Sequence, residues 1–148
     1  MPPRQPVTMS RIETILLATD ASPASGAAEG QAIELAARLG ARLLVLSVVS
    51  GPPPAREARQ LAVEAIVQRA RAGGAEAGGM TWNGDAGEAI VDAAEAESAD
   101  LIVVGTHERG AVGRLFLGSV SDHVVRHARC PVMVVRPTRV AAPAVTGA

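Results

Sequence analysis

Lysine is absent from the 148-residue sequence, and all 14 of its basic residues are arginine. This absence excludes a lysine-dependent phosphate loop and a lysine Schiff base. Cysteine occurs once, at Cys130, so a disulfide within the chain is impossible and a reducing compartment is expected. Tryptophan, tyrosine and phenylalanine make up only 1% of the residues. The core must therefore consist of Val, Ile, Leu and Ala, a mixture typical of parallel strands covered by alanine-rich helices.

The chain also has little net charge and no long hydrophobic run. The formal net charge is −1 and the arginines are interspersed with acidic residues, so nucleic acid is not an expected partner. No apolar run approaches the length of a membrane span, and residues 1–10 are polar, without an apolar signal core. We therefore expect a cytoplasmic protein with neither nucleic acid nor a membrane as its partner.

The length of the chain suits one domain. A chain of 148 residues is long enough for a substantial core and too short for two. We expect a flexible N-terminus over residues 1–10, a single domain over 11–137 and a disordered tail over 138–148.

Five short apolar runs alternate with four helical patterns in this domain. The runs are residues 15–18, 43–49, 80–82, 101–104 and 131–135, of which 80–82 is the weakest. Strands that are separated by helix-length segments form a parallel sheet through right-handed crossovers, with helices on both faces. The sequence therefore predicts an α/β fold of three layers, in which a five-stranded parallel sheet lies between four helices.

Proline and glycine mark where the predicted helices begin and end. Ser22 and Pro23 are predicted to be the N-cap and the first residue of the first helix, and Gly40 its C-terminal glycine. Residues 51–54 include three consecutive prolines and are predicted to form a loop. The third helix is predicted to begin directly after residues 84–85.

Three polar or glycine-containing segments follow predicted strands: residues 19–22, 48–51 and 105–119. In open parallel sheets, ligands bind beyond the carboxyl ends of the strands, at the point where the strand order reverses. The sequence therefore predicts that these segments form one ligand site.

The segment 105–119 is the most informative of the three. Its glycines leave backbone N–H groups uncovered, and Gly118 and Ser119 open a helix, an arrangement that suits a phosphate group. The same pattern is typical of a connector followed by a serine N-cap, so spacing alone leaves both interpretations open. Asp20 likewise fits either an acceptor for a ribose or adenine edge or a turn carboxylate before a helix.

Three segments of the chain resemble the universal stress protein family. They are ILLATDAS at residues 15–22, NGDAGEAIVDAAEAESADLIVVGTH at 83–107 and LGSVSDHVVRHARCPVMVV at 117–135. They stand in the family's order and at its spacing, and the resemblance covers residues 12–136. It implies a sheet with strand order 3-2-1-4-5, a homodimer formed through the last strand, Val132–Val135, and, as in many members, ATP binding.

The resemblance also implies roles for particular residues. Asp20 matches the family's nucleoside contact, and Val48 matches the residue whose backbone contacts adenine. The family's phosphate signature, Gly-x2-Gly-x9-Gly-Ser/Thr, begins here at Gly105 and ends at Gly118 and Ser119. The residues predicted to contact the nucleotide are Ala18, Thr19, Asp20, Val48, Gly105, His107, Glu108, Gly118, Ser119 and Val120.

The middle glycine of that signature is replaced by Glu108. Glycine permits close backbone approach, whereas glutamate adds a charge of the same sign as the phosphates. Two like charges about 5 Å apart repel by roughly 3 kcal/mol at an effective dielectric constant near 20, or about two decades in affinity. Four arrangements would relieve this repulsion: Glu108 faces solvent, Arg109 or Arg114 neutralises it, Mg²⁺ bridges it to the phosphates, or Gly110 takes over the close approach.

We therefore expect a homodimeric stress-response and signalling module that binds ATP and is not a conventional enzyme, with at most slow ATP hydrolysis or autophosphorylation. The alternative, which Glu108 favours, is a stress protein that binds no nucleotide and acts through dimer and partner contacts. An enzyme is the weakest hypothesis because the sequence has no Gly-x-Ser-x-Gly elbow and no supporting carboxylate pair.

The remaining reactive side chains are predicted to be structural. His123 and His127 are spaced i, i+4, which is compatible with a metal, but no third ligand is evident, so no metal is expected. Cys130 is predicted to be buried and inert. A solvated helix face is predicted for Arg56, Glu57, Arg59 and Glu64.

Overall fold

A computed structural model describes residues 11–106 and 118–137. The predicted flexible N-terminus (1–10) and disordered tail (138–148) lie outside these residues, so the predicted domain limits stay predictions. His107 and Glu108 also lie outside them.

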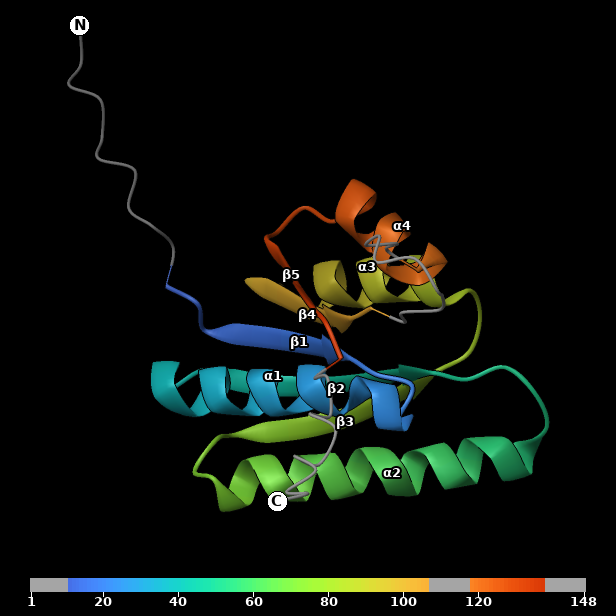
Figure 1. Cartoon of the computed structure of the whole chain (residues 1–148), viewed down its shortest axis with the longest axis horizontal. Helices are drawn as coiled ribbons and strands as arrows, with labels where there is room; N and C mark the ends of the chain where they lie inside the picture. Colours follow the sequence, from blue (N-terminus) through green and yellow to red (C-terminus); the bar gives the residue numbers. More distant parts are fainter. Residues whose placement is uncertain (1–10, 107–117, 138–148) are drawn as a thin grey trace, which may run out of the picture.

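The described residues form a five-stranded sheet in which all neighbouring strands are parallel (Figure 1). The strands are β1 (Thr14–Ala18), β2 (Arg42–Val48), β3 (Ala77–Trp82), β4 (Leu101–Gly105) and β5 (Val132–Val135). Their order is β3-β2-β1-β4-β5, which confirms the order that the resemblance implies. Because the order reverses between β1 and β4, the carboxyl ends of these two strands form the switch point at which such sheets bind ligands.

Within the described residues, four α-helices and one short 3₁₀ helix cover the sheet. They are η1 (Pro23–Ser25), α1 (Gly26–Leu39), α2 (Pro53–Ala72), α3 (Ala86–Ala96) and α4 (Ser119–His127). Helices α1 and α2 pack on one face and α3 and α4 on the other (Figure 1), which confirms the predicted three-layer α/β fold. None of these described helices combines the length and the apolar character that crossing a membrane requires.

Strand β1 lies at the centre of the core. Ile15 and Leu17 pack in the cluster beneath α1 and α2, whereas Leu16 packs in the cluster beneath α3 and α4. All three side chains are fully buried. Helices on both faces therefore account for the unbroken apolar run of this strand, since neither set of alternating side chains meets water.

The first helix begins later than predicted. Pro23 starts η1, and α1 begins only at Gly26. Ser22 is the N-cap of η1 rather than of α1. Its side chain makes no capping hydrogen bond, so the prediction of a capping serine side chain is wrong. Gly40 ends α1 in the left-handed conformation with a φ of 65°, which confirms the predicted C-terminal glycine.

Helix α2 begins inside the segment predicted to be a loop, residues 51–54. It starts at Pro53, because the first turn of a helix needs no N–H donor and the φ of proline suits it. Strand β3 also begins earlier than predicted, at Ala77. A Cβ on Gly79 would lie 2.5 Å from Cγ1 of Val63, so glycine permits the close packing of α2 on this strand.

Candidate functional site

A pocket of about 510 Å³ lies at the carboxyl edge of the sheet, over the switch point between β1 and β4. The ends of β1, β2 and β4 and the first turns of α3 and α4 form its walls. The lining residues are Ala18, Thr19, Asp20, Ala24, Ser25, Leu46, Val48, Ala86, Ile90, Val104, Gly105, Thr106, Gly118, Ser119, Val120 and Ser121. The structure thus brings described residues from each of the three predicted segments together where the sequence predicts a ligand site.

Most residues that are predicted to contact a nucleotide line this pocket. They are Ala18, Thr19, Asp20, Val48, Gly105, Gly118, Ser119 and Val120. The other two, His107 and Glu108, lie outside the described residues. Contact between any of these residues and a nucleotide stays a prediction.

Sequence reasoning missed several wall residues. Leu46 lies two positions before Val48 on β2, and both side chains pack in the cluster beneath α3 and α4, so they project from the same face of the sheet. Val104 lies near the end of β4, and Thr106 follows that strand directly. Ile90 adds a further apolar side chain from α3. Alternation along β2 is the signal that would have found Leu46, once Val48 was chosen. Thr106 lies within the predicted ligand segment 105–119, but no local pattern distinguishes it there.

Thr106 is the most unusual polar residue of the pocket. It is 2% exposed, and its hydroxyl oxygen Oγ1 has no hydrogen-bond partner, alone among the buried side-chain N and O atoms of the described residues. Its backbone N–H donates to the carbonyl of Val135 at 3.0 Å, so the main chain at this position is fixed. A buried hydroxyl without a partner costs about 1–3 kcal/mol relative to one that is satisfied.

The N-terminus of α4 meets the same pocket. The N-cap is Gly118, and no side chain within the described residues caps the first turn. Ser121 Oγ donates to the carbonyl of Gly118 at 3.1 Å and so does not cap the helix, whose first N–H groups have no partner within the helix itself. These N–H groups and the positive end of the helix dipole favour an anion at this point.

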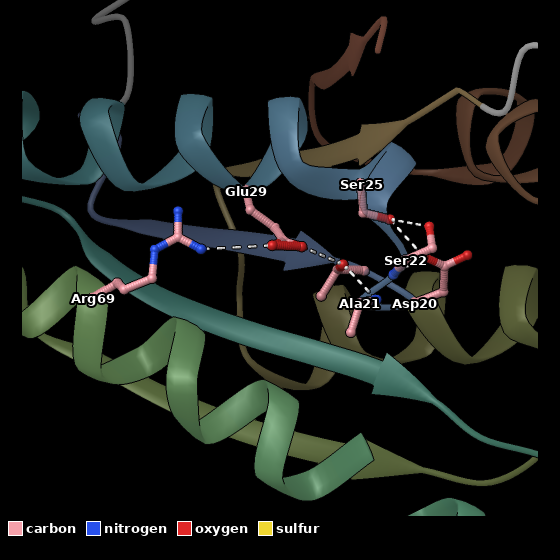
Figure 2. A network of polar contacts seen from close by, with 7 residues as sticks. Asp20, Ala21, Ser22, Ser25, Glu29 and Arg69 are labelled. Carbon is pink, nitrogen blue, oxygen red and sulfur yellow. Dashed lines mark hydrogen bonds and ion pairs between the residues drawn. The ribbon is translucent and has the colours of Figure 1, made fainter. Parts of the chain in front are cut away.

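Asp20 organises the turn that joins β1 to η1. Its Oδ1 atom accepts a hydrogen bond from Ser22 N at 2.9 Å and another from Ser25 Oγ at 2.5 Å (Figure 2). Ala21, which lies between Asp20 and Ser22, has a φ of 59°, which is uncommon for a residue other than glycine. Asp20 therefore acts as a turn carboxylate, one of the two interpretations left open by the sequence, and it also lines the pocket.

Two arginines of α2 make polar contacts that the prediction of a solvated helix face did not include. Arg59 Nη1 donates to Ser47 Oγ on β2 at 2.8 Å, and Arg56 Nη1 donates to Asn83 Oδ1 at 3.1 Å. Arg56 Nη2 also donates to the carbonyl of Thr81 at 3.3 Å. The prediction is wrong for these two side chains, because arginine stems are long enough to reach back from the helix to the sheet.

The two histidines of α4 pack against each other and against α3. Their rings stack with centroids 4.2 Å apart, and His127 Nδ1 lies 2.9 Å from the carbonyl oxygen of His123. A Cβ on Gly87 of α3 would lie 2.9 Å from the ring of His123. No group of three or more metal-ligating side chains occurs in residues 11–106 and 118–137.

Cys130 is only half-buried, which corrects the prediction of a buried thiol. Burial and then the negative charge of Asp100 raise the pKa of its thiol. The thiolate, which is the reactive form, is therefore disfavoured.

The fold and the pocket define an α/β domain with a ligand-type cavity at the switch point of a parallel sheet. The model of the universal stress protein family matches residues 11–136, and the chain belongs to that family. A universal stress protein from the QAH/OAS sulfhydrylase 3′ region of Thermus aquaticus is 43% identical over 136 residues, which cover 84% of this chain and 98% of the relative.

Solved structures agree with this membership. A universal stress protein from Archaeoglobus fulgidus superposes with a TM-score of 0.76 at 25% identity, over 84% of this chain and 98% of its own. A universal stress protein in complex with cAMP superposes with a TM-score of 0.71 at 27% identity, over 87% of this chain and all of its own.

Proposed function

We propose that this chain binds an adenine nucleotide, with ATP as the predicted ligand, in the switch-point pocket and acts as a homodimeric stress-response module. The volume of about 510 Å³ lies within the range of about 300–1,000 Å³ that is usual for small-ligand sites. A family member of the same fold is in complex with cAMP, which supports an adenine nucleotide as the ligand class.

The observation that carries this proposal is that Thr106 and the start of α4 line the same pocket. An unpartnered hydroxyl and an uncapped helix N-terminus line one pocket, and together they offer donors without acceptors. A phosphate oxygen supplies the missing acceptor, and charge-assisted hydrogen bonds of this kind are about twice as strong as neutral ones. The phosphate is therefore proposed to lie between Thr106 and Ser119.

The nucleoside is proposed to occupy the other half of the pocket. Leu46, Val48, Ile90 and Val104 form an apolar wall there. A flat, apolar purine face suits such a wall, with Val48 contacting adenine through its backbone and Asp20 contacting the ribose, as the family implies. Mg²⁺ is proposed to accompany ATP because a divalent ion offsets the like charges of carboxylate and phosphate.

The homodimer is proposed to form through β5, residues Val132–Val135. This strand stands at the end of the sheet order and pairs with β4 on one side. Its four side chains are apolar and only half-buried. An unpaired apolar edge favours pairing with a second copy. The expected cytoplasmic location and lack of enzyme activity stay predictions.

Isothermal titration calorimetry with AMP, cAMP, adenosine and ATP, the last with and without Mg²⁺, tests the ligand. The informative variant is Ser119→Glu, which places a carboxylate where the phosphate is proposed to bind. At about 5 Å the repulsion of roughly 3 kcal/mol should weaken AMP binding about 100-fold. Ser119→Gln, of equal size but uncharged, is the control and should retain most of the affinity.

Adenosine separates the two halves of the site, because it lacks the phosphate and should bind both variants alike. No binding of any nucleotide to the wild-type protein would support the alternative, a stress protein that acts through partner contacts alone. The hypothesis of an enzyme is tested by incubation with ATP. If ATP binds stoichiometrically and stays intact over hours, turnover is excluded.

Sedimentation velocity tests the dimer. The variant Val134→Arg places a charge on the edge strand and should give a monomer at micromolar concentration. Val125→Arg, on an exposed position of α4, is the matched control and should leave the dimer intact. A wild-type monomer at this concentration contradicts the proposed assembly.

A further inference from the structure

Thr19 is a buried polar residue in the wall of the pocket. Its backbone N–H donates to the carbonyl of Leu46 at 3.0 Å, and its own carbonyl accepts from Ser47 Oγ at 2.6 Å. Its hydroxyl donates to Glu29 Oε2 at 3.0 Å and accepts from Ala21 N at 3.0 Å. Each of the polar atoms of Thr19 thus has a protein partner, which is the arrangement expected of a positioning residue.

Glu29 interrupts the apolar face of α1. Ala28, Ala32 and Ala36 on that face are buried, and Glu29 between them is only 7% exposed. A buried carboxylate is unfavourable unless hydrogen bonds and opposite charge compensate it. Arg69 Nη1 lies 3.8 Å from Glu29 Oε1, but the arginine side chain is 57% exposed, so this ion pair is weak (Figure 2). The hydrogen bond from Thr19 is the close contact of this carboxylate.

The hydroxyl of Thr19 has a single hydrogen atom, which it donates in the hydrogen bond to Glu29. The oxygen lone pairs of Thr19 then face Ala21 N, which donates to them. Ala21 stands in the left-handed region with a φ of 59°, a conformation that alanine keeps only when its surroundings hold it. The turn that carries Asp20 to the pocket is therefore held by the hydroxyl of Thr19 in addition to the hydrogen bonds that Asp20 accepts from Ser22 and Ser25.

We propose that Glu29 is a positioning residue of the ligand site. Its carboxylate orients the hydroxyl of Thr19, which holds Ala21 in its left-handed conformation and so sets Asp20 at the pocket wall. The ligand consequence rests on the proposed function, whereas the control of the turn by Glu29 is a property of the unliganded chain.

The opposite side of Thr19 is held independently of Glu29. Arg59 Nη1 donates to Ser47 Oγ at 2.8 Å, and Ser47 Oγ donates to the carbonyl of Thr19. The strand end therefore stays in place when Glu29 is replaced, and the effect of the replacement falls on the turn.

The decisive variants are Glu29→Met, which removes the acceptor, and Glu29→Gln, whose amide oxygen preserves it. Glu34→Met is the matched control, since Glu34 lies on the same helix in an exposed ion pair with Arg38. Amide hydrogen exchange by NMR on the unliganded protein should show Ala21 N–H exchanging about tenfold faster in Glu29→Met, as expected for loss of one hydrogen bond. Glu29→Gln and Glu34→Met should match the wild type.

Calorimetry with AMP gives the second measurement. Glu29→Met should raise the Kd about tenfold, while the other two variants stay within about twofold of the wild type. If Glu29→Met does not fold, Thr19→Val removes the same hydroxyl at nearly the same shape and should show the same faster exchange at Ala21.

The outcomes separate the two proposals. If wild-type protein binds no AMP, the proposed function fails, and the exchange rate of Ala21 still decides whether Glu29 controls the turn. Unchanged exchange in Glu29→Met overturns the positioning role. Equal loss in Glu29→Gln and Glu29→Met overturns the acceptor mechanism, because the charge and not the hydrogen bond would then matter.

Discussion

Replacing Thr106 with valine should stabilise the unliganded protein and weaken its nucleotide binding. Valine keeps the branched shape and removes the hydroxyl whose oxygen has no partner. Relief of that buried, unsatisfied group is worth about 1 kcal/mol, which raises the Tm of a chain of this size by about 2–4 °C. Loss of a hydrogen bond to a phosphate is worth about 1.5–3 kcal/mol, so the Kd should rise by roughly 10- to 150-fold.

Urea denaturation and calorimetry with AMP measure the two effects on the same sample. For the stability measurement, Thr19→Val is the matched control, because the hydroxyl of Thr19 has two partners. It should destabilise the protein by about 1–3 kcal/mol, which is the opposite sign from Thr106→Val. A destabilised Thr106→Val variant, or one with the affinity of the wild type, would refute the reasoning that this hydroxyl is unsatisfied in the free protein and binds the phosphate.

Two further predictions concern packing and the thiol. Gly79→Ala should lower the free energy of unfolding in urea by roughly 1–3 kcal/mol because its Cβ would lie 2.5 Å from Val63 Cγ1. Gly78→Ala, whose Cβ has Leu44 Cδ2 as nearest neighbour at 4.0 Å, should differ little from the wild type; equal effects would contradict the close approach of α2. Cys130 should react with iodoacetamide at pH 8 more slowly in the folded than in the urea-unfolded protein, because burial raises its pKa. Since the unfolded chain loses this proton first, stability should fall as the pH rises above about 8.5, the usual thiol pKa; equal alkylation rates in the two states would contradict the shift.

The layers of the fold could be predicted because they follow from features along the chain. The fully apolar run around Leu16 indicates a strand covered on both faces, and Gly40 indicates a helix end through its left-handed conformation. Strand order itself came from the resemblance to the family. The start of β3 could not be predicted, because Gly79 is favourable there only through its contact with α2.

The location of the site could be predicted from the sequence, but its polar contacts could not. Asp20 was recognised at the end of β1, whereas its bonds to Ser22 and Ser25 depend on a turn whose φ angles no local pattern specifies. Glu29 is buried, although a glutamate in a helical sequence pattern is expected on the solvent-exposed surface. Whether the hydroxyl of Thr106 has a partner depends on every donor and acceptor around it, which only the folded chain defines.

Helix α4 and strand β5 are consecutive, and only residues 128–131 join them. Four residues reach at most about 14 Å when fully extended, so this connection has little slack. The first turn of α4, where Gly118 and Ser119 line the pocket, is therefore separated from the strand at the end of the sheet order only by the rest of a nine-residue helix and this short connection. One continuous stretch of chain, residues 118–135, thus forms both a wall of the cavity and the outer strand proposed to pair with a second copy.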